Sequence, residues 1–406
     1  MESSKFLIEQ VNVAFMSDFM APPSIEVITS LKEVSEKEWN NCNSEENPFT
    51  SYAFLRALEE SGSATQNTGW LSQHLILREG DGAIAAVAPL YLKNHSYGEY
   101  VFDWGWADAY ERAGGRYYPK LQCAVPFTPV SGPRLMVRKG QGKDRTTAFR
   151  LTLAEGMIQL AQKLEVSSVH ITFPTKSETT DLANLGFLQR NGQQFHWSNQ
   201  GFKDFDDFLD QLTSRKRKAI KKERKKIKDM NFKIQALSGS EIKEFHWDYF
   251  YKFYTSTTDK KWGQNYLKRD FFSLTGQWMG EKVVLITVEH NGELVAGALN
   301  LRDRKTLYGR NWGCLKTHKF LHFETCYYQA IEYAIENGLQ KVEAGAQGHH
   351  KIQRGYLPMP TWSLHWIADP KLRNAIQPYL ESERLGIDAE MRELMEYSPY
   401  KNITLS

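Results

Sequence analysis

The stretch 282–357 limits what this chain can fold into more than any other part of it. Two apolar runs flank Asn291-Gly292, and this dipeptide between apolar runs is a strong short-range signal for a β-hairpin. A strand is predicted next at 307–312, followed by an amphipathic helix, a short strand and the Gly-rich loop 343–355. Polar side chains gathered where strands end are typical of functional sites in α/β sheets. We therefore expect the functional site in this stretch.

Length and composition indicate a globular protein of more than one domain. A chain of 406 residues is too long for one ordinary domain, and 41% hydrophobic with 24% charged residues is a globular composition. No apolar run approaches the roughly 20 residues that cross a bilayer, and the N-terminus lacks the pattern of a secretory signal. The four cysteines are widely spaced without a CxxC pair. Reduced thiols and a cytoplasmic location are therefore predicted.

The order of predicted elements occurs twice along the chain, which indicates two similar domains. We expect an N-terminal extension over 1–24, a first domain over 25–200, a second domain over 201–369 and a C-terminal helical tail over 370–406. Each domain contains a hairpin, a strand, helices and closing strands. The strand predicted at 362–366 is expected to close the sheet of the second domain.

The segment 93–120 is unusually rich in both polar and aromatic residues. It is too polar for a core and too aromatic for a solvated loop, so we expect it to line a substrate cleft. A long loop capped by aromatic residues is the alternative. Arg134, at the end of a Pro-rich segment, joins the set of expected substrate-binding residues, which otherwise comprises His95, Tyr97, Glu99, Asp103, Trp104 and Trp106.

The run 215–228 holds ten basic residues and one acid, a local charge of +9 in a chain of net charge +3. It is predicted to lie on a helix over 213–230. One interpretation is a solvated amphipathic helix. The other is a docking strip for a phosphate-rich partner such as transfer RNA. Docking to a membrane surface is less favoured, because the helix lacks a Trp/Phe/Leu face. The residues expected to contact phosphates are Lys221, Lys222, Lys225 and Lys226.

Several long sequence blocks resemble a known family. They read NPFTSYAFLRALEESGS, PFTPVSGPR, SRKRKAIKKERKK, LYGRNWGC, LHFETCYYQAIEYAI and EAGAQGHHKIQRGYLP, together with the segment 93–120. These blocks are similar to those of the bacterial FemAB-like predicted N-acyltransferases, also called peptidoglycan biosynthesis/recognition proteins. The resemblance implies an α/β fold of tandem GNAT-like domains, each a mixed, mostly antiparallel sheet with flanking helices. It also implies acyl transfer, and enzymes of the peptidoglycan branch take aminoacyl groups from transfer RNA.

Acyl transfer from coenzyme A needs a phosphate cradle, which GNAT domains build from a Gly-rich loop that enters a helix. In the first half, the loop 138–143 has the glycines, but Val137 stands where Arg or Gln is usual. Its candidate phosphate-binding residues are Arg138, Lys139 and Lys143. In the second half, the segment 313–319 is basic but holds only one glycine, so acyl-CoA and aminoacyl-tRNA both remain as donors.

The amphipathic helix after His322 supplies the first catalytic candidates. Glu324 is expected in its first turn, where a partly buried carboxylate can act as general base with His322 adjacent. The alternative is a glutamate that only complements the helix dipole. His318 lies four residues before His322, but the HExxH glutamate is absent and no metal is expected. The residues predicted to face the core are Phe323, Cys326, Tyr327, Ala330, Ile331, Ala334 and Ile335.

The Gly-rich loop 343–355 supplies further candidates. His350 can carry a proton near neutral pH, while Lys351 and Arg354 can pair with phosphate, carboxylate or an oxyanion. A solvated basic loop without a binding role is the alternative. The remaining expected substrate-binding residues, on this loop and on the neighbouring strand, are Gln347, Arg310, Asn311 and Trp312.

These features together predict a transferase that moves an acyl or aminoacyl group to a small-molecule amine acceptor. Two alternatives remain open at this point. One is a non-catalytic binding or recognition protein on a degenerate GNAT scaffold, and the other is a transfer-RNA or phosphate-binding protein that uses the basic helix. The identity of the donor and of the acceptor, and the oligomeric state, do not follow from the sequence.

Overall fold

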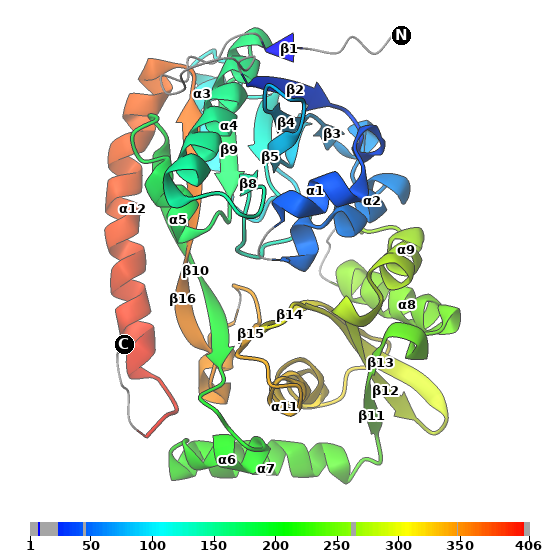
Figure 1. Ribbon diagram of the computed structural model, residues 1–406. Helices are drawn as coiled ribbons and strands as arrows, with labels where there is room; N and C mark the ends of the chain where they lie inside the picture. The colour runs from blue at the N-terminus through cyan, green and yellow to red at the C-terminus, as the bar shows by residue number, and fades with distance from the viewer. Residues whose placement is uncertain (1–6, 9–22, 44–45, 261–264, 347, 402–406) are drawn as a thin grey trace. The chain divides into compact units, whose positions relative to one another are not determined.

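The computed structural model describes residues 7–8, 23–43, 46–260, 265–346 and 348–401 (Figure 1). The chain divides into two compact units. The first combines residues 1–192 with 361–385, and the second combines residues 193–360 with 386–406. The strand 361–367 and the first part of the C-terminal helix therefore belong to the first unit, whereas the sequence analysis placed them in the second domain and in a separate tail.

The first unit contains a five-stranded sheet in the order β1-β2-β4-β5-β8, all antiparallel. Its strands are β1 (Leu7–Ile8), β2 (Ser24–Ile28), β4 (His74–Arg78), β5 (Ile84–Ala88) and β8 (Met136–Val137). The sequence predicts one strand over 83–92, but Pro89 has no N–H to continue a ladder, and the chain divides there into β5 and β6 (Leu90–Lys93).

A second group of paired strands in the first unit has the order β3-β6-β7-β9-β16. In it β7 and β9 are parallel and the other described pairs are antiparallel. The long helix α4 (Lys143–Lys163) packs on this unit's strands, and its buried residues join one apolar core with β4, β5, β7 and β9. The further strands are β3 (Leu71–Ser72), β7 (Lys120–Cys123), β9 (Ser168–Thr172) and β16 (Leu357–Ile367).

Short helices complete the first unit. Ser51 caps α2 (Tyr52–Glu60) by accepting a hydrogen bond from the Phe54 N–H, as its place before the helix predicts. The segment 93–120 is not one long loop, because Trp104–Arg112 forms the helix α3. The C-terminal helix α12 (Pro370–Glu396) is continuous, with Pro378 inside it, where the sequence predicts two shorter helices. The remaining helices of this unit are α1 (Glu36–Cys42) and α5 (Lys176–Asp181).

The second unit has the strand order β11-β12-β13-β14-β15-β10. The hairpin predicted around Asn291-Gly292 is confirmed, and both residues have the positive φ that this tight turn requires. Among the described pairs only β14 and β15 are parallel, so the sheet is mixed and mostly antiparallel. The strands are β11 (Lys233–Ser238), β12 (Val283–His290), β13 (Glu293–Arg302), β14 (Thr306–Cys314), β15 (Lys341–Glu343) and β10 (Leu188–Ser198).

Helices of the second unit surround this sheet. The predicted basic helix forms as α7 (Ser214–Lys228), after the short α6 (Phe205–Asp210). Gly313 allows close packing of α8 on β14, because a Cβ at this position would meet the Phe253 carbonyl oxygen. The remaining helices are α8 (Glu244–Lys260), α9 (Arg269–Met279), α10 (Leu321–Phe323) and α11 (Gln329–Glu336), with a π-helical turn over Glu324–Tyr328.

The two units share a topology, and each takes its closing strand from a distant part of the chain. The order β6-β7-β9-β16 in the first unit matches β13-β14-β15-β10 in the second, with one parallel pair in the same place. The prediction that 362–366 closes the second sheet is wrong, because Ser363–Ile367 pairs with β9. Alternating apolar residues identify a strand but not its partner.

Candidate functional site

The parallel strands β14 and β15 separate in the second unit and leave a small pocket. They pair only over Thr306–Tyr308 and Lys341–Glu343. Beyond Glu343 the chain follows β10 instead, since the Ala344 N–H donates to the Phe195 carbonyl at 3.0 Å. On its other side β14 stays paired with β13 as far as Cys314, with an irregular register at Leu299/Asn300. A strand that loses one neighbour presents backbone N–H and C=O groups to whatever occupies the gap.

The pocket in this gap has a volume of about 110 Å³. Four residues predicted for the site meet here: Arg310, Asn311 and Trp312 from β14, and His322 from α10. The other lining residues are Ala298, Leu299, Asn300, Gly309, Cys326, Tyr327 and Ala344. The pocket is therefore lined both by the open edge of β14 and by two side chains that can transfer protons, His322 and Tyr327.

The helix that follows β14 begins after a residue in the left-handed conformation and contains a π-helical turn. Phe320 adopts a left-handed conformation with φ of 72°, and α10 begins at the next residue. The π-helical turn over Glu324–Tyr328 comes next, and such turns are frequent at functional sites. It presents Tyr327 to the pocket, and the His322 ring lies 5.3 Å from the Tyr327 ring and 5.5 Å from the Trp312 ring.

His350 lies beside the pocket and is linked to it through Tyr327. Its Nε2 is 3.1 Å from the Tyr327 hydroxyl oxygen, and its ring packs on Phe323 at 5.3 Å between centroids. Partial burial lowers the pKa of His350, and the charges of Arg354 and Lys351 lower it further. Burial raises the pKa of the Tyr327 hydroxyl, so this group stays protonated at neutral pH. The His350 imidazole can therefore accept a proton, and the Tyr327 hydroxyl can donate one.

Glu324, predicted as a general base, is held away from the pocket. It is 4% exposed and is not among the residues that line the gap. The Arg224 guanidinium of α7 contacts it at 3.0 Å, and Gln329 donates to it at 2.9 Å. Arg224 also pairs with Glu332 at 2.7 Å. These contacts occupy the carboxylate of Glu324 and join α7 to the π-helical turn.

The basic residues predicted in the Gly-rich loop have partners of their own. Lys351 is 5% exposed and its Nζ donates to the carbonyls of Ala344 and Gly345, while burial lowers its pKa to about 8. Arg354 is 6% exposed and pairs with Glu223 of α7 at 2.9 Å. Both therefore brace the loop next to the pocket. Gln347 lies outside the described residues.

His318 and His322 do not share a helix face. The left-handed Phe320 lies between them, and the His318 ring packs on Phe232 at 5.1 Å, whereas His322 lines the pocket. In the described part of the chain, no group of three or more His, Cys, Asp and Glu residues is arranged to hold a metal ion.

Comparison with known families decides the assignment of the chain. The sequence profile of the FemAB-like family, described as peptidoglycan biosynthesis/recognition, matches residues 30–402. This chain belongs to the FemAB-like family. No curated protein sequence matches it.

A solved structure with low sequence identity shares the fold, and two others align with the chain at lower TM-scores. A crystal structure of FemX has 12% identity and a TM-score of 0.53, over 85% of this chain and 98% of that chain. A tandem GNAT protein from the clavulanic acid biosynthesis pathway, solved without AcCoA, has 11% identity and a TM-score of 0.45, over 86% and 99%. L-PGS from Bacillus licheniformis has 10% identity and a TM-score of 0.47, over 80% and 95%. The predicted α/β fold of tandem GNAT-like domains is confirmed.

The basic helix of this FemAB-like chain lies at the surface of the second unit (Figure 1). Ile220 and Ile227 are its buried apolar residues, and the four lysines predicted to meet phosphates are exposed. Lys221 pairs with Asp206, but that contact is solvent-exposed and is worth little. Lys226 lies 5.6 Å from the Phe320 ring at the start of α10, so the basic surface reaches the helix that lines the pocket.

The Gly-rich loop of the first unit precedes α4 as predicted, beside a pocket of about 160 Å³. Two of its three basic residues are engaged, since Arg138 pairs with Glu79 and Lys139 pairs with Glu46 at 3.5 Å. Lys143 is exposed at the first residue of α4. These pairs reduce the positive charge available to an anion at this loop.

The segment 93–120 of the FemAB-like chain has its charges inside and several of its rings outside. Glu99 and Asp103 are 4% and 2% exposed, and both pair with the fully buried Lys120. By contrast, Tyr97 and Trp104 are each 46% exposed. The sequence predicts that both kinds of residue line a cleft, but the acids instead form a buried ionic cluster.

The other predicted substrate-binding residues of the first unit are also mostly enclosed. Trp106 is 8% exposed, and His95 is partly buried next to Gly69. Arg134 is 1% exposed, and its guanidinium donates to the backbone carbonyls of Val130, Gly132, Pro133 and Thr172. Arg134 thus holds the Pro-rich segment in place.

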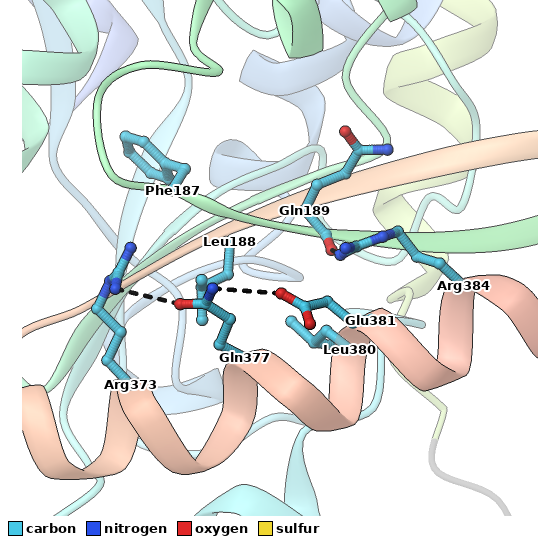
Figure 2. A pocket seen from close by; sticks show the side chains of 8 residues that line it. All are labelled: Phe187, Leu188, Gln189, Arg373, Gln377, Leu380, Glu381 and Arg384. Atoms are coloured by element: carbon cyan, nitrogen blue, oxygen red, sulfur yellow. Dashed lines mark hydrogen bonds between the residues drawn. The ribbon is translucent and has the colours of Figure 1, made fainter.

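A larger hollow of about 300 Å³ lies between α12 and the start of β10 in the first unit (Figure 2). Figure 2 shows Arg373, Gln377 and Glu381 hydrogen-bonded in a row along α12, while Arg384 donates to the Gln189 carbonyl at 2.6 Å. Its apolar lining is Phe187, Leu188 and Leu380. No motif in the sequence predicts a site here.

Sequence reasoning missed three residues that shape the candidate site. Tyr327 is predicted to face the core, and it does belong to the apolar core of the second unit, but it also lines the pocket, which its place on the apolar stripe does not predict. Glu223 and Arg224 were treated as part of a solvated basic run. A usable signal was present, because Glu223 is the one acid among ten bases in that run.

In the described residues no helix is long and apolar enough to span a bilayer.

Proposed function

We propose that this FemAB-like chain is an N-acyltransferase that works in the pocket between β14 and β15. The family and the tandem GNAT-like fold support the acyltransferase class in general. The observation that carries the proposal is the pocket itself, where an open strand edge faces His322 and Tyr327. Acyl transfer needs donors for an oxyanion, a base for the amine and an acid for the leaving group.

The reaction joins an amine nitrogen to an activated acyl carbon. The nitrogen attacks the carbonyl, the N–C bond forms, and the C–O bond of an ester or the C–S bond of a thioester breaks. His322 accepts the proton that the amine loses, since it lines the pocket. Tyr327 donates a proton to the departing oxygen or sulfur and recovers one through His350, 3.1 Å away. The N–H groups on the open edge of β14 and the Arg310 side chain stabilise the oxyanion.

The donor is an acyl ester or thioester on a phosphate-bearing carrier. Coenzyme A fits the described residues poorly. The basic residues Arg138 and Lys139 of the first unit already have carboxylate partners, and the segment before α10 lacks the glycines of a phosphate cradle. The exposed lysines of α7 suit a longer polyanion, and we infer an aminoacyl-tRNA as the donor and a small-molecule amine as the acceptor.

The test offers both donors to the purified protein. Radiolabelled acetyl-CoA and a mixture of aminoacyl-tRNAs are each incubated with a pool of amines, and the labelled amide is measured. We expect transfer from aminoacyl-tRNA and a loss of 100-fold or more in His322→Ala or Tyr327→Phe. Glu381→Gln, on α12 in the first unit, serves as the control and should retain activity.

The outcomes separate the proposal from its alternatives. Transfer from acetyl-CoA alone would keep the acyltransferase and reject the RNA carrier. Amine or RNA binding without transfer from either donor would reject the enzyme and favour a recognition protein on a GNAT scaffold. Equal activity of His322→Ala and wild type would refute the assigned base.

A further inference from the structure

The one acidic residue of the basic helix α7 points inward. Glu223 is partly buried, with a side chain 17% exposed, among lysines that are exposed. A single acid in such a run is usually a solvated partner for neighbouring lysines. Glu223 instead contacts two residues from other segments of the second unit, Arg354 of the Gly-rich loop and Tyr328 of the π-helical turn. Both segments adjoin the candidate site.

The contact with Arg354 is charge-assisted and enclosed. The Arg354 Nη2 lies 2.9 Å from Oε1 and 3.0 Å from Oε2 of Glu223. Arg354 is 6% exposed, and among the described residues Glu223 is the carboxylate that pairs with it. A buried guanidinium that loses its counter-ion is strongly destabilised, so Arg354 depends on Glu223 to stay where it is.

Arg354 in turn holds His350 in two ways. Its Nη1 donates to the His350 carbonyl at 2.7 Å. Its guanidinium lies 3.5 Å from the centroid of the Phe323 ring, and the same ring packs on the His350 imidazole at 5.3 Å between centroids. The Glu223 carboxylate is therefore connected through Arg354 to both the backbone and the ring of His350.

We infer that Glu223 is a positioning residue, which holds His350 against the Tyr327 hydroxyl through Arg354. The inference rests on the proposed function for its catalytic meaning, because it assigns His350 to the proton path through Tyr327. The contacts that lead from Glu223 of α7 to His350 can be tested without a transfer assay.

The matched control is Glu332→Gln. Glu332 also joins the site helix to α7, through Arg224 at 2.7 Å, but it has no contact with Arg354. Both variants replace a glutamate by its neutral isostere and remove one ion pair with the same basic helix. A general loosening of α7 should therefore appear in both, whereas loss of the Arg354 contact should appear in Glu223→Gln alone.

The first readout is the titration of His350, followed by NMR of its imidazole C–H and assigned with His350→Gln. Burial and the charges of Arg354, Lys351 and His349 hold its pKa below the ordinary value. In Glu223→Gln, Arg354 moves to solvent and we expect this pKa to rise. Arg354→Gln should raise it as well, and the double variant should match Arg354→Gln alone, because Glu223 acts through Arg354.

The second readout is steady-state transfer. Glu223→Gln should lower kcat roughly 10- to 100-fold with little change in KM, because a displaced proton carrier affects the chemical step more than binding. An unchanged His350 titration in a folded Glu223→Gln protein would overturn the inference, and so would an equal effect in Glu332→Gln. If wild type transfers nothing but the titration shifts as expected, the proposed function fails and the positioning contact stands.

Discussion

The buried ionic cluster of the first unit makes a strong prediction for Lys120→Met. The Lys120 Nζ donates to Glu99 at 2.7 Å, to Asp103 at 2.5 Å and to Ser96 at 2.8 Å, and the lysine is 0% exposed. Methionine has a similar length and no charge. The substitution therefore leaves two carboxylates close together in the interior without the lysine that they share, and the remaining buried cation, Lys93, is 3.9 Å from Glu99.

The expected cost follows from this geometry. Breaking a buried pair by removing one partner costs about 3–5 kcal/mol, because the remaining charge stays desolvated. Burial opposes the charged form of Lys120, yet Glu99 and Asp103 raise its pKa, which indicates that they outweigh the burial. With a urea dependence of about 1–3 kcal/mol per molar, the urea midpoint should fall by about 1–5 M.

The assay must resolve the two units, because one stability value is not defined for a chain that unfolds in parts. Urea unfolding with peptide-resolved hydrogen exchange provides this, and the loss should appear in β7 and α3 of the first unit. Lys139→Met is the control, since Lys139 is 54% exposed with Glu46 at 3.5 Å and should cost less than about 1 kcal/mol.

A compensating variant completes the test. Adding Glu99→Gln and Asp103→Asn to Lys120→Met removes both carboxylates together with their shared lysine and should restore part of the lost stability, because the uncompensated negative charge causes the cost. Recovery should be incomplete, because Lys93 then loses its partner Glu99. A loss below about 1 kcal/mol in Lys120→Met, or no recovery in the triple variant, would refute the view that the cluster is a tightly coupled ionic core.

Three further predictions test other parts of the molecule. Burial raises the pKa of Glu99 to about 7 from an ordinary value near 4.5, so Glu99 takes up a proton on folding. The contribution of Glu99 to stability is therefore complete below pH 4.5 and decreases by up to about 3 kcal/mol as the pH rises to 7, and in Glu99→Gln this part of the slope should disappear in pH-dependent urea unfolding. Gly313→Ala should cost about 1–3 kcal/mol in the second unit by the same measurement, because its Cβ would lie 2.1 Å from the Phe253 carbonyl oxygen, and an unchanged stability would contradict this packing. Neutralising four exposed lysines of α7 should weaken transfer-RNA binding and reduce the slope of log binding constant against log salt concentration by about 3. An unchanged slope would show that the RNA binds at another surface. The four lysines are Lys221, Lys222, Lys225 and Lys226.

Local signals in the sequence determined many elements and the broad location of the pocket. The hairpin at Asn291-Gly292 and the helix α7 follow from turn chemistry and periodicity, which act over a few residues. Arg310 and His322 were grouped for the same reason, since a strand end and the next helix are close along the chain. Sequence blocks also sufficed to predict the FemAB-like family.

Tertiary structure alone decided which charges meet. Glu99 and Asp103 looked like cleft residues, but Lys120 lies opposite them on β7 and draws them into the interior. Glu324 was predicted as a base, but in the structure its carboxylate pairs with Arg224, 100 residues earlier, and lies outside the pocket lining. Ion pairs between distant segments leave no periodic trace in a sequence.

The closing strands and the π-helical turn show the same limit. The strand at 363–367 is readable as a strand, yet its partner is β9 of the first unit, because an apolar pattern does not encode which sheet it joins. Tyr327 is readable as a core position on the helix, and the structure confirms this, yet only the tertiary structure shows that it also lines the pocket with His322. The sequence by itself thus determined the elements and the family, while long-range packing decided which side chains carry the chemistry.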